Sequence, residues 1–173
     1  MLARVHSTAL LGIEAHLCEV EVDVTGRGFG LPTLVGLPDS AIKESTDRIR
    51  SALLNSGYHQ PKSRTTINLA PASLRKEGPS FDLPIAIGML IADDQVIAAS
   101  SEDFLIAGEL ALDGRVRPVK GVLSMAICCR EQGFAGLIVP HENAEEAAVV
   151  EEINVFGVSS LTEAGGRFAR NTE

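Results

Sequence analysis

The chain has 173 residues, of which 45% are hydrophobic and 22% charged, and its net charge is −8. This length is enough for one globular domain with a substantial core, and the acidic total argues against a generally basic nucleic-acid-binding domain. Three cysteines, two of them adjacent, argue against a disulfide framework, and no apolar run reaches the roughly 20 residues of a membrane span. We therefore expect a cytoplasmic protein that makes no membrane contact.

The N-terminal part of the chain predicts a β-hairpin. Residues 2–10 and 13–24 are rich in strand-forming residues, and apolar side chains alternate with acidic ones along the second segment. Residues 26–30 (GRGFG) resemble a phosphate loop only superficially. They lack the Lys-Ser/Thr ending and run into Leu31 and Pro32 and not into a helix, so we do not expect nucleotide binding there.

The next elements are a short strand, a helix and a second strand. Residues 33–36 and 65–70 have strand character, and residues 37–40 (LPDS) supply capping chemistry for a helix that ends at Asn55 before Ser56 and Gly57. Its expected buried stripe is Ile42, Ile49, Leu53 and Leu54.

Residues 75–88 (RKEGPSFDLPIAIG) combine a turn, a helix start and a hydroxyl group. Gly78 and Pro79 form the turn, Ser80 has a side chain preferred at an N-cap, and Asp82 places negative charge in the first turn. The residues that follow are almost all apolar, which predicts a buried helix. Ser80 is therefore either a helix cap, the interpretation we prefer, or a nucleophile.

The second half alternates strands and helices. Residues 104–108 and 115–118 are expected to be strands joined through Asp113 and Gly114, a strong hairpin signal. A helix over 121–132, a strand over 137–139, a helix over 144–150 capped by Asn143, and a strand over 153–158 follow. Residues 164–173 are expected to be a frayed tail. This order indicates an α/β (α+β) domain over residues 1–163, with a mixed sheet, an N-terminal hairpin and helices mainly on one face.

Two blocks, residues 69–84 and 108–123, resemble the N-terminal domain of the magnesium-chelatase-subunit-like AAA+ family that includes ComM and YifB. The resemblance extends to residues 36–45 and 139–147, and thus over essentially the whole chain. More distantly, the same blocks are similar to the proteolytic domain of Lon protease and the Lon-like domain of RadA. This resemblance implies a Lon-type fold placed ahead of an AAA+ ATPase that binds ATP and Mg²⁺ and assembles as a hexameric ring. No GxxxxGK[ST] loop occurs here, so the ATPase lies outside this sequence.

The resemblance also implies a test of chemistry, because Lon uses a serine activated by a lysine. Ser80 matches the serine, but Leu123 stands where the lysine is required. A leucine cannot accept a proton, and a serine without a base is a weak nucleophile. Lys120, one helical turn earlier, is an alternative base. The resemblance thus favours a catalytically silent accessory domain of a DNA branch-migration helicase that serves natural transformation. The alternatives are an active Ser-Lys peptidase and, less favoured for want of a phosphate loop, a small-molecule kinase relative.

Basic residues are concentrated before position 77, whereas residues 131–163 contain seven acids and no lysine or arginine. We expect that any contact with nucleic acid is made by a basic face despite the acidic total, since screening confines the influence of each charge to about 8–10 Å; contact with a protein partner or with ring neighbours is the alternative. The members of the basic face would be Arg64, Arg75, Lys76, Arg115, Arg117 and Lys120. In the Lon-type fold the serine and lysine regions meet, which implies that Lys76 lies near Lys120. His6 and His16 have no further ligands at metal-binding spacing, so no metal site is expected.

Overall fold

The computed structural model describes residues 1–26, 28, 31–97 and 100–169. The interpretation of the GRGFG stretch therefore falls largely outside the described residues. The main sheet has seven strands in the order β3-β4-β2-β1-β5-β8-β9, and β6 and β7 form a separate two-stranded ribbon. The β2 strand pairs antiparallel with β1 and with β4, and the other neighbouring pairs of the main sheet are parallel. The expected α/β class with a mixed sheet is confirmed.

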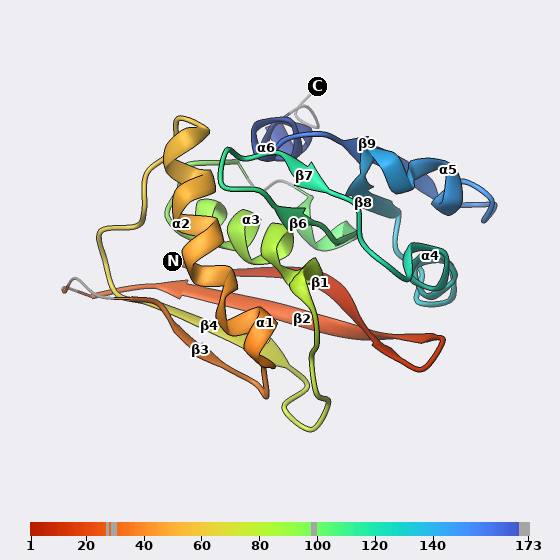
Figure 1. The fold of residues 1–173 in the computed structure, drawn as a ribbon, viewed down its shortest axis with the longest axis horizontal. Helices are drawn as coiled ribbons and strands as arrows, with labels where there is room; N and C mark the ends of the chain where they lie inside the picture. Colours follow the sequence, from red (N-terminus) through yellow and green to blue (C-terminus); the bar gives the residue numbers. More distant parts are fainter. Residues whose placement is uncertain (27, 29–30, 98–99, 170–173) are drawn as a thin grey trace.

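The N-terminal hairpin is confirmed in its register and in its buried face. Strands β1 (Leu2–Leu11) and β2 (Glu14–Val24) pair along their whole length, and Cys18, Val20, Val22 and Val24 are buried as their alternation predicts. The hairpin turn lies beside α4 (Val122–Glu131), where the Ser124 hydroxyl donates to the Ile13 carbonyl at 2.6 Å (Figure 1).

The expected helix over residues 40–55 is two helices, α1 (Ser40–Lys43) and α2 (Ser45–Asn55). They connect strand β3 (Thr33–Val35) to β4 (Thr65–Ala70), which pair in parallel. The prediction that Leu54 is buried is wrong: its side chain is 56% exposed, and the buried stripe of α2 contains Ala52 beside Ile49 and Leu53. Those three residues are spaced i, i+3 and i+4, which places them on one face of the helix.

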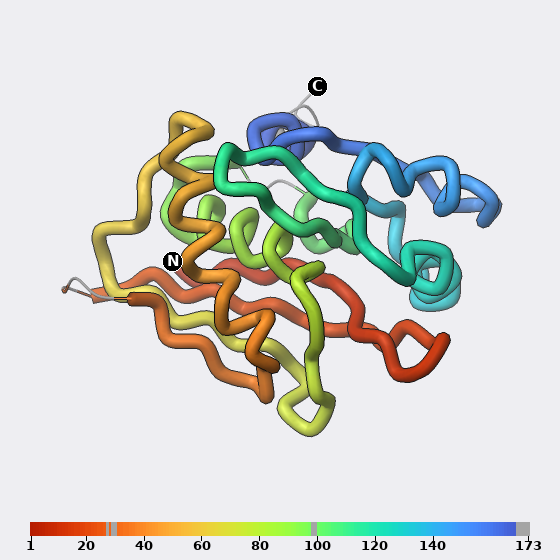
Figure 2. Tube along the Cα trace, in the orientation of Figure 1, coloured from red at the N-terminus to blue at the C-terminus, as the bar shows by residue number. Residues whose placement is uncertain are grey.

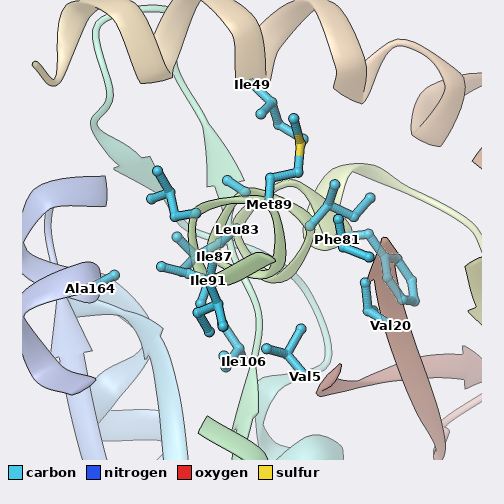
Figure 3. Close-up of a cluster of buried hydrophobic side chains, with 14 of the residues drawn as sticks. Val5, Val20, Ile49, Phe81, Leu83, Ile87, Met89, Ile91, Ile106 and Ala164 are labelled. Carbon is cyan, nitrogen blue, oxygen red and sulfur yellow. The ribbon is translucent and has the colours of Figure 1, made fainter. Parts of the chain in front are cut away.

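Helix α3 (Asp82–Ala92) is the centre of the core, and all eleven of its residues are buried. It packs on β1 and β2 and, through Met89, on Ile49 of α2; Ile106 and Ala164 close other sides (Figure 3). Gly88 permits the close contact with the sheet, because a Cβ there would lie 2.8 Å from Val22 Cγ2. The prediction of a buried helix is confirmed, and burial on every side is the reason that it shows no polar face.

The hairpin signal at Asp113 and Gly114 is correct, but the strands it joins differ from those predicted. It connects β6 (Glu109–Leu110) to β7 (Val116–Arg117). The β5 strand (Phe104–Ile106) instead lies inside the main sheet between β1 and β8 (Gly136–Pro140), parallel to both. The chain leaves the sheet after Ala107, because the Gly108 N–H donates to the Ser80 carbonyl at 3.0 Å.

Helices cover the two halves of the sheet differently. Over β1, β2 and β4 the helices α1, α2 and α3 lie on one side, as predicted (Figure 1). Farther along the sheet, Ile106 and Ile138 face α3, whereas Leu105 and Leu137 pack against α4 on the opposite face. Here α5 (Ala144–Ala147) joins α4 under β8 and β9 (Asn154–Val158), so this half is covered on both faces.

The expected frayed tail from residue 164 is corrected by helix α6 (Leu161–Ala169). Ala164 and Phe168 are buried in the core, and Gly165 lies so close to Tyr58 that a Cβ there would be 2.8 Å from its hydroxyl. Gly165 therefore serves close packing, neither glycine ends the helix, and residues 170–173 lie outside the described part of the chain.

Candidate functional site

A cavity of about 550 Å³ opens where the segment between β4 and α3 meets the segment between β7 and α4. Figure 2 follows the first of these segments outward beyond the sheet and back to the start of α3. The two segments are those that the Lon resemblance links, and the structure brings them together. The lining includes Thr8, Leu10, Asp39, Glu77, Ser80, Ala107, Glu109, Lys120, Val122 and Met125.

Ser80 lies in a 3-10 turn, η1 (Pro79–Phe81), and is not the N-cap of α3. The helix starts at Asp82, its N-cap residue Phe81 already has helical backbone angles, and no side chain caps it. The cap prediction is therefore wrong, because the extra turn moves Ser80 one residue too far from the helix start. Among the described residues its hydroxyl has no hydrogen-bond partner, and the residue is partly exposed at the cavity.

The position expected for a catalytic lysine lies outside this cavity. Leu123 is in the first turn of α4 with 41% of its surface exposed, and its N–H donates to Glu146 Oε1 at 3.2 Å. Lys120 does line the cavity, but within the described part of the chain it makes no hydrogen bond to Ser80. The structure thus brings Ser80 and Lys120 to one cavity without forming a nucleophile–base pair, whose hydrogen bond normally measures about 2.6–3.2 Å.

The loop that carries Lys120 is fixed by a residue whose predicted role was different. Asn143 was expected to cap the following helix, but its side chain makes no such bond. Instead Oδ1 accepts from the Val119 N–H at 2.9 Å, and Nδ2 donates to the Val119 carbonyl at 3.1 Å. Asn143 therefore makes a tertiary contact in place of the predicted helix cap, and this contact satisfies both backbone groups of Val119.

The prediction that Lys76 belongs to the basic face is wrong. Its side chain is completely buried, and Nζ donates to the Gly36 carbonyl at 2.6 Å and to the Pro71 carbonyl. Desolvation lowers the pKa of this ammonium group below its ordinary value. Lys76 therefore joins two loops, the one after β3 and its own segment between β4 and α3, and it neither belongs to a basic surface nor lines the cavity beside Lys120.

The other basic candidates are exposed but do not form one face. Arg115 and Arg117 lie on the same side of the β7 ribbon with Val116 buried between them, as their alternation predicts. Arg64 precedes β4 where that strand pairs with the end of β2, the far end of the sheet from Leu10. Eight residues of strand separate the two ends, or about 26 Å.

Nearby carboxylates neutralise two of these cations. Arg75 lies 3.5 Å from Glu77 Oε1, and Arg115 Nε lies 2.8 Å from Asp113 Oδ2. Within the described chain, Arg64, Arg117 and Lys120 have no ion pair. Arg117, at the end of β7, interacts electrostatically with Asp113 and lies opposite Glu109, whereas Lys120 on the β7–α4 segment lines the cavity.

A buried ion pair below the cavity was not predicted. Asp82 is fully buried and accepts from Arg48 Nε at 2.7 Å, Arg48 Nη2 at 3.0 Å and the Leu110 N–H at 3.0 Å. The Ser45 hydroxyl donates to it as well. These hydrogen bonds raise the pKa of Arg48, and they link α2, α3 and β6. The sequence signal for this pair was the acidic residue Asp82 in the first turn of a predicted helix. The helix dipole already accounts for an acid at that position, so this signal gave no reason to expect an ion pair.

Two further properties bear on the kind of site. Among the described residues, no group of three or more His, Cys, Asp and Glu side chains is placed to hold a metal ion. None of the described helices combines the length and the apolar character needed to cross a membrane.

These features define a mixed α/β domain with a serine-containing cavity and no assembled catalytic pair. The family described as "Subunit ChlI of Mg-chelatase" matches residues 20–143. The chain therefore belongs to this family, a magnesium-chelatase-like AAA+ family, which confirms the resemblance seen in the sequence.

Similar proteins agree with this assignment. The chain is 45% identical over 160 residues to "Competence protein ComM" of Haemophilus influenzae, covering 92% of this chain and 31% of that protein. It is 44% identical over 149 residues to YifB of Escherichia coli, covering 86% and 29%. A Lon protease of Rhizobium meliloti is 26% identical over 148 residues, covering 79% and 18%. The chain thus spans about a third of the length of ComM and YifB.

Proposed function

We propose that this chain is a non-proteolytic accessory and interaction domain of a ComM-like AAA+ protein. The observation that carries the proposal is the missing base: Leu123 replaces the lysine and lies outside the cavity, and the Ser80 hydroxyl has no partner within the described chain. Removing a triad member typically costs a serine hydrolase several orders of magnitude in rate, so an isolated hydroxyl gives no useful turnover.

The remainder of such a protein would carry the motor. In this proposal an ATPase module binds ATP and Mg²⁺ and forms a hexamer in the cytoplasm, and this domain docks on that module and on its ring neighbours. The similarity to a protein named for competence supports natural transformation as the process served, and in this proposal the motor drives DNA branch migration there.

A fluorophosphonate probe tests the catalytic part of the proposal. The purified chain should not be labelled and should not cleave casein or short peptides, and Ser80→Ala should behave identically. An active Lon protease serves as the positive control. Labelling or turnover that disappears in Ser80→Ala would establish the alternative, an active peptidase with Lys120 as its base.

DNA contact is a second part of the proposal, supported by the exposed basic side chains of Arg115, Arg117 and Lys120, which lie within six residues of one another. Their binding would be weak, indifferent to sequence and strongly dependent on salt. An Arg115→Ala, Arg117→Ala, Lys120→Ala variant should lose low-salt binding to both single- and double-stranded DNA, whereas Arg64→Ala, at the far end of the sheet, should retain it. Equal binding by all three proteins, or no binding at all, would reject this surface.

A further inference from the structure

The cavity beside Ser80 has the composition of a binding pocket and not only of a lost active site. Its volume of about 550 Å³ lies within the range of 300–1,000 Å³ typical of ligand sites. Leu10, Ala107, Val122 and Met125 give it an apolar lining, and they come from three segments of the chain, since Val122 and Met125 both lie on α4. An apolar side chain that entered the cavity would therefore be removed from water at a favourable free energy.

The charges around this apolar lining are unbalanced. Three carboxylates, Asp39, Glu77 and Glu109, line the cavity together with one ammonium group, that of Lys120. Asp39 is engaged by the N–H groups of Ile42 and Gly78 at 2.9 and 3.1 Å, and Glu77 is near Arg75. Glu109 accepts no hydrogen bond and forms no ion pair within the described chain, although it interacts electrostatically with Arg48 and lies opposite Arg117 in the β6–β7 ribbon. Its carboxylate thus keeps its hydrogen-bonding capacity for a cation that enters the cavity.

Two hydroxyl groups complete the polar part of the lining. Ser80 and Thr8 both line the cavity, and in the described structure neither side chain has a hydrogen-bond partner. Hydroxyls both donate and accept, so they suit the N–H and C=O groups of a peptide backbone. An apolar lining, hydroxyls without hydrogen-bond partners and a carboxylate that accepts no hydrogen bond together match a peptide that carries a basic side chain next to an apolar one.

We propose that this cavity binds a short protein segment in which a lysine or arginine neighbours an aliphatic residue, and that Glu109 pairs with the basic side chain. The aliphatic residue occupies the space between Leu10 and Met125. This inference rests on the proposed function in one respect, namely that the bound segment is not cleaved.

The test uses two fluorescent peptides of equal length and the chain as it stands. The basic probe is Leu-Lys-Val-Arg-Leu and the acidic probe is Leu-Glu-Val-Asp-Leu, both blocked at their ends, with binding followed by anisotropy. The basic probe should bind with the higher affinity. Glu109→Gln should weaken it about three- to fivefold, the loss expected for one partly exposed charge pair.

Two further variants separate the cavity from a general acidic attraction. Lys120→Glu should strengthen binding of the basic probe, because it adds a carboxylate to the same lining. Glu102→Gln, on an exposed residue beside Met1 and Arg4, should leave the affinity unchanged. Neither Lys120 nor Glu102 is buried, so both variants should fold.

The inference is overturned if neither probe binds, if both bind equally, or if Glu109→Gln and Lys120→Glu leave the affinity unchanged. Mass spectrometry of the recovered probe keeps the two proposals apart. Cleavage of a probe that binds as expected would refute the non-proteolytic function and leave the recognition site intact. An uncleaved probe that binds independently of Glu109 would refute the recognition site and leave the non-proteolytic function intact.

Discussion

Asp82 is a completely buried carboxylate whose charge is balanced by Arg48, a residue with 20% of its side chain exposed. Replacing Arg48 would leave that carboxylate in the core with hydrogen bonds only from Ser45 and Leu110. Breaking a buried pair by removing one partner is strongly destabilising, whereas replacing both partners often is not. The pair therefore specifies how α2, α3 and β6 fit together more than it adds net stability.

We expect Arg48→Ala to lower the free energy of unfolding by about 3–5 kcal/mol, the cost of an unpaired buried charge. Urea denaturation followed by circular dichroism measures it. Arg50→Ala is the matched control: Arg50 lies two residues along the same helix, is exposed, and has no ion pair within the described residues. A loss of similar size in both variants would contradict the role given to the Arg48–Asp82 pair.

The thiols of Cys18 and Cys129 predict a pH dependence of stability. Both are fully buried, and desolvation raises the pKa of each from 9.0 to about 11. Because the unfolded chain loses these protons first, the stabilisation is complete below about pH 9 and is lost as the pH rises toward 11. Unfolding at pH 8 and at pH 10 should show it, with a slope of up to about 1.4 kcal/mol per pH unit for each thiol.

A Cys18→Ala variant serves as the comparison for this slope. The free energy of unfolding of this variant should depend less on pH between 9 and 11 than that of the original chain. Lys76, whose pKa is lowered by burial, contributes with the opposite sign. Because Cys18 raises that pKa, Cys18→Ala also lowers the pKa of Lys76 further, and this change reduces the loss of stability at high pH in the same direction as removal of the thiol. Identical slopes would show that the Cys18 thiol is not protected in the folded state.

At the scale of elements, two loop segments complete a cavity whose other lining includes residues of β1 and α4. The segment between β7 and α4 reaches Ser80 because Asn143 holds Val119 by both of its backbone groups, while Glu146 holds the Leu123 N–H. The opposite wall is held by Lys76, whose ammonium group joins two loops. The shape of the site thus depends on polar side chains that lie outside it.

We expect Asn143→Ala to destabilise the domain by about 1–3 kcal/mol, because it leaves two backbone groups of Val119 without partners. Asn143 is only 8% exposed, so water replaces these bonds poorly. Asn55→Ala is the control, since Asn55 makes one exposed hydrogen bond, to the Leu112 carbonyl. Thermal unfolding compares the two variants. An equal or larger loss of stability for Asn55→Ala would contradict the role given to the Asn143–Val119 hydrogen bonds.

For the whole molecule, we expect the chain alone to be monomeric. In the proposed function the ring is held mainly by the ATPase module, and a net charge of −8 opposes self-association. Light scattering coupled to size exclusion at moderate salt should give the mass of one chain, 18.3 kDa. A stable hexamer would contradict the expectation and make this domain itself the organiser of the ring.

The sequence by itself determined the features that depend on local periodicity. Alternation in β2 identified its buried face, the apolar run after Pro79 identified α3 as a buried helix, and the blocks around Ser80 and Gly108 identified the family. These inferences succeed because periodicity reports directly which face of an element avoids water.

Only the tertiary structure decided the role of each polar side chain. Lys76 reaches a carbonyl 40 residues away, Arg48 a carboxylate 34 residues away, and Asn143 a backbone 24 residues away. A sequence shows that such groups can form hydrogen bonds but not with which partner. From local rules, Lys76 was expected to be a surface cation, Arg48 was one basic residue among several, and Asn143 was expected to be a helix cap. Their actual partners differ because a buried polar group must be satisfied by whichever segment the topology brings beside it, and that segment is distant in the chain.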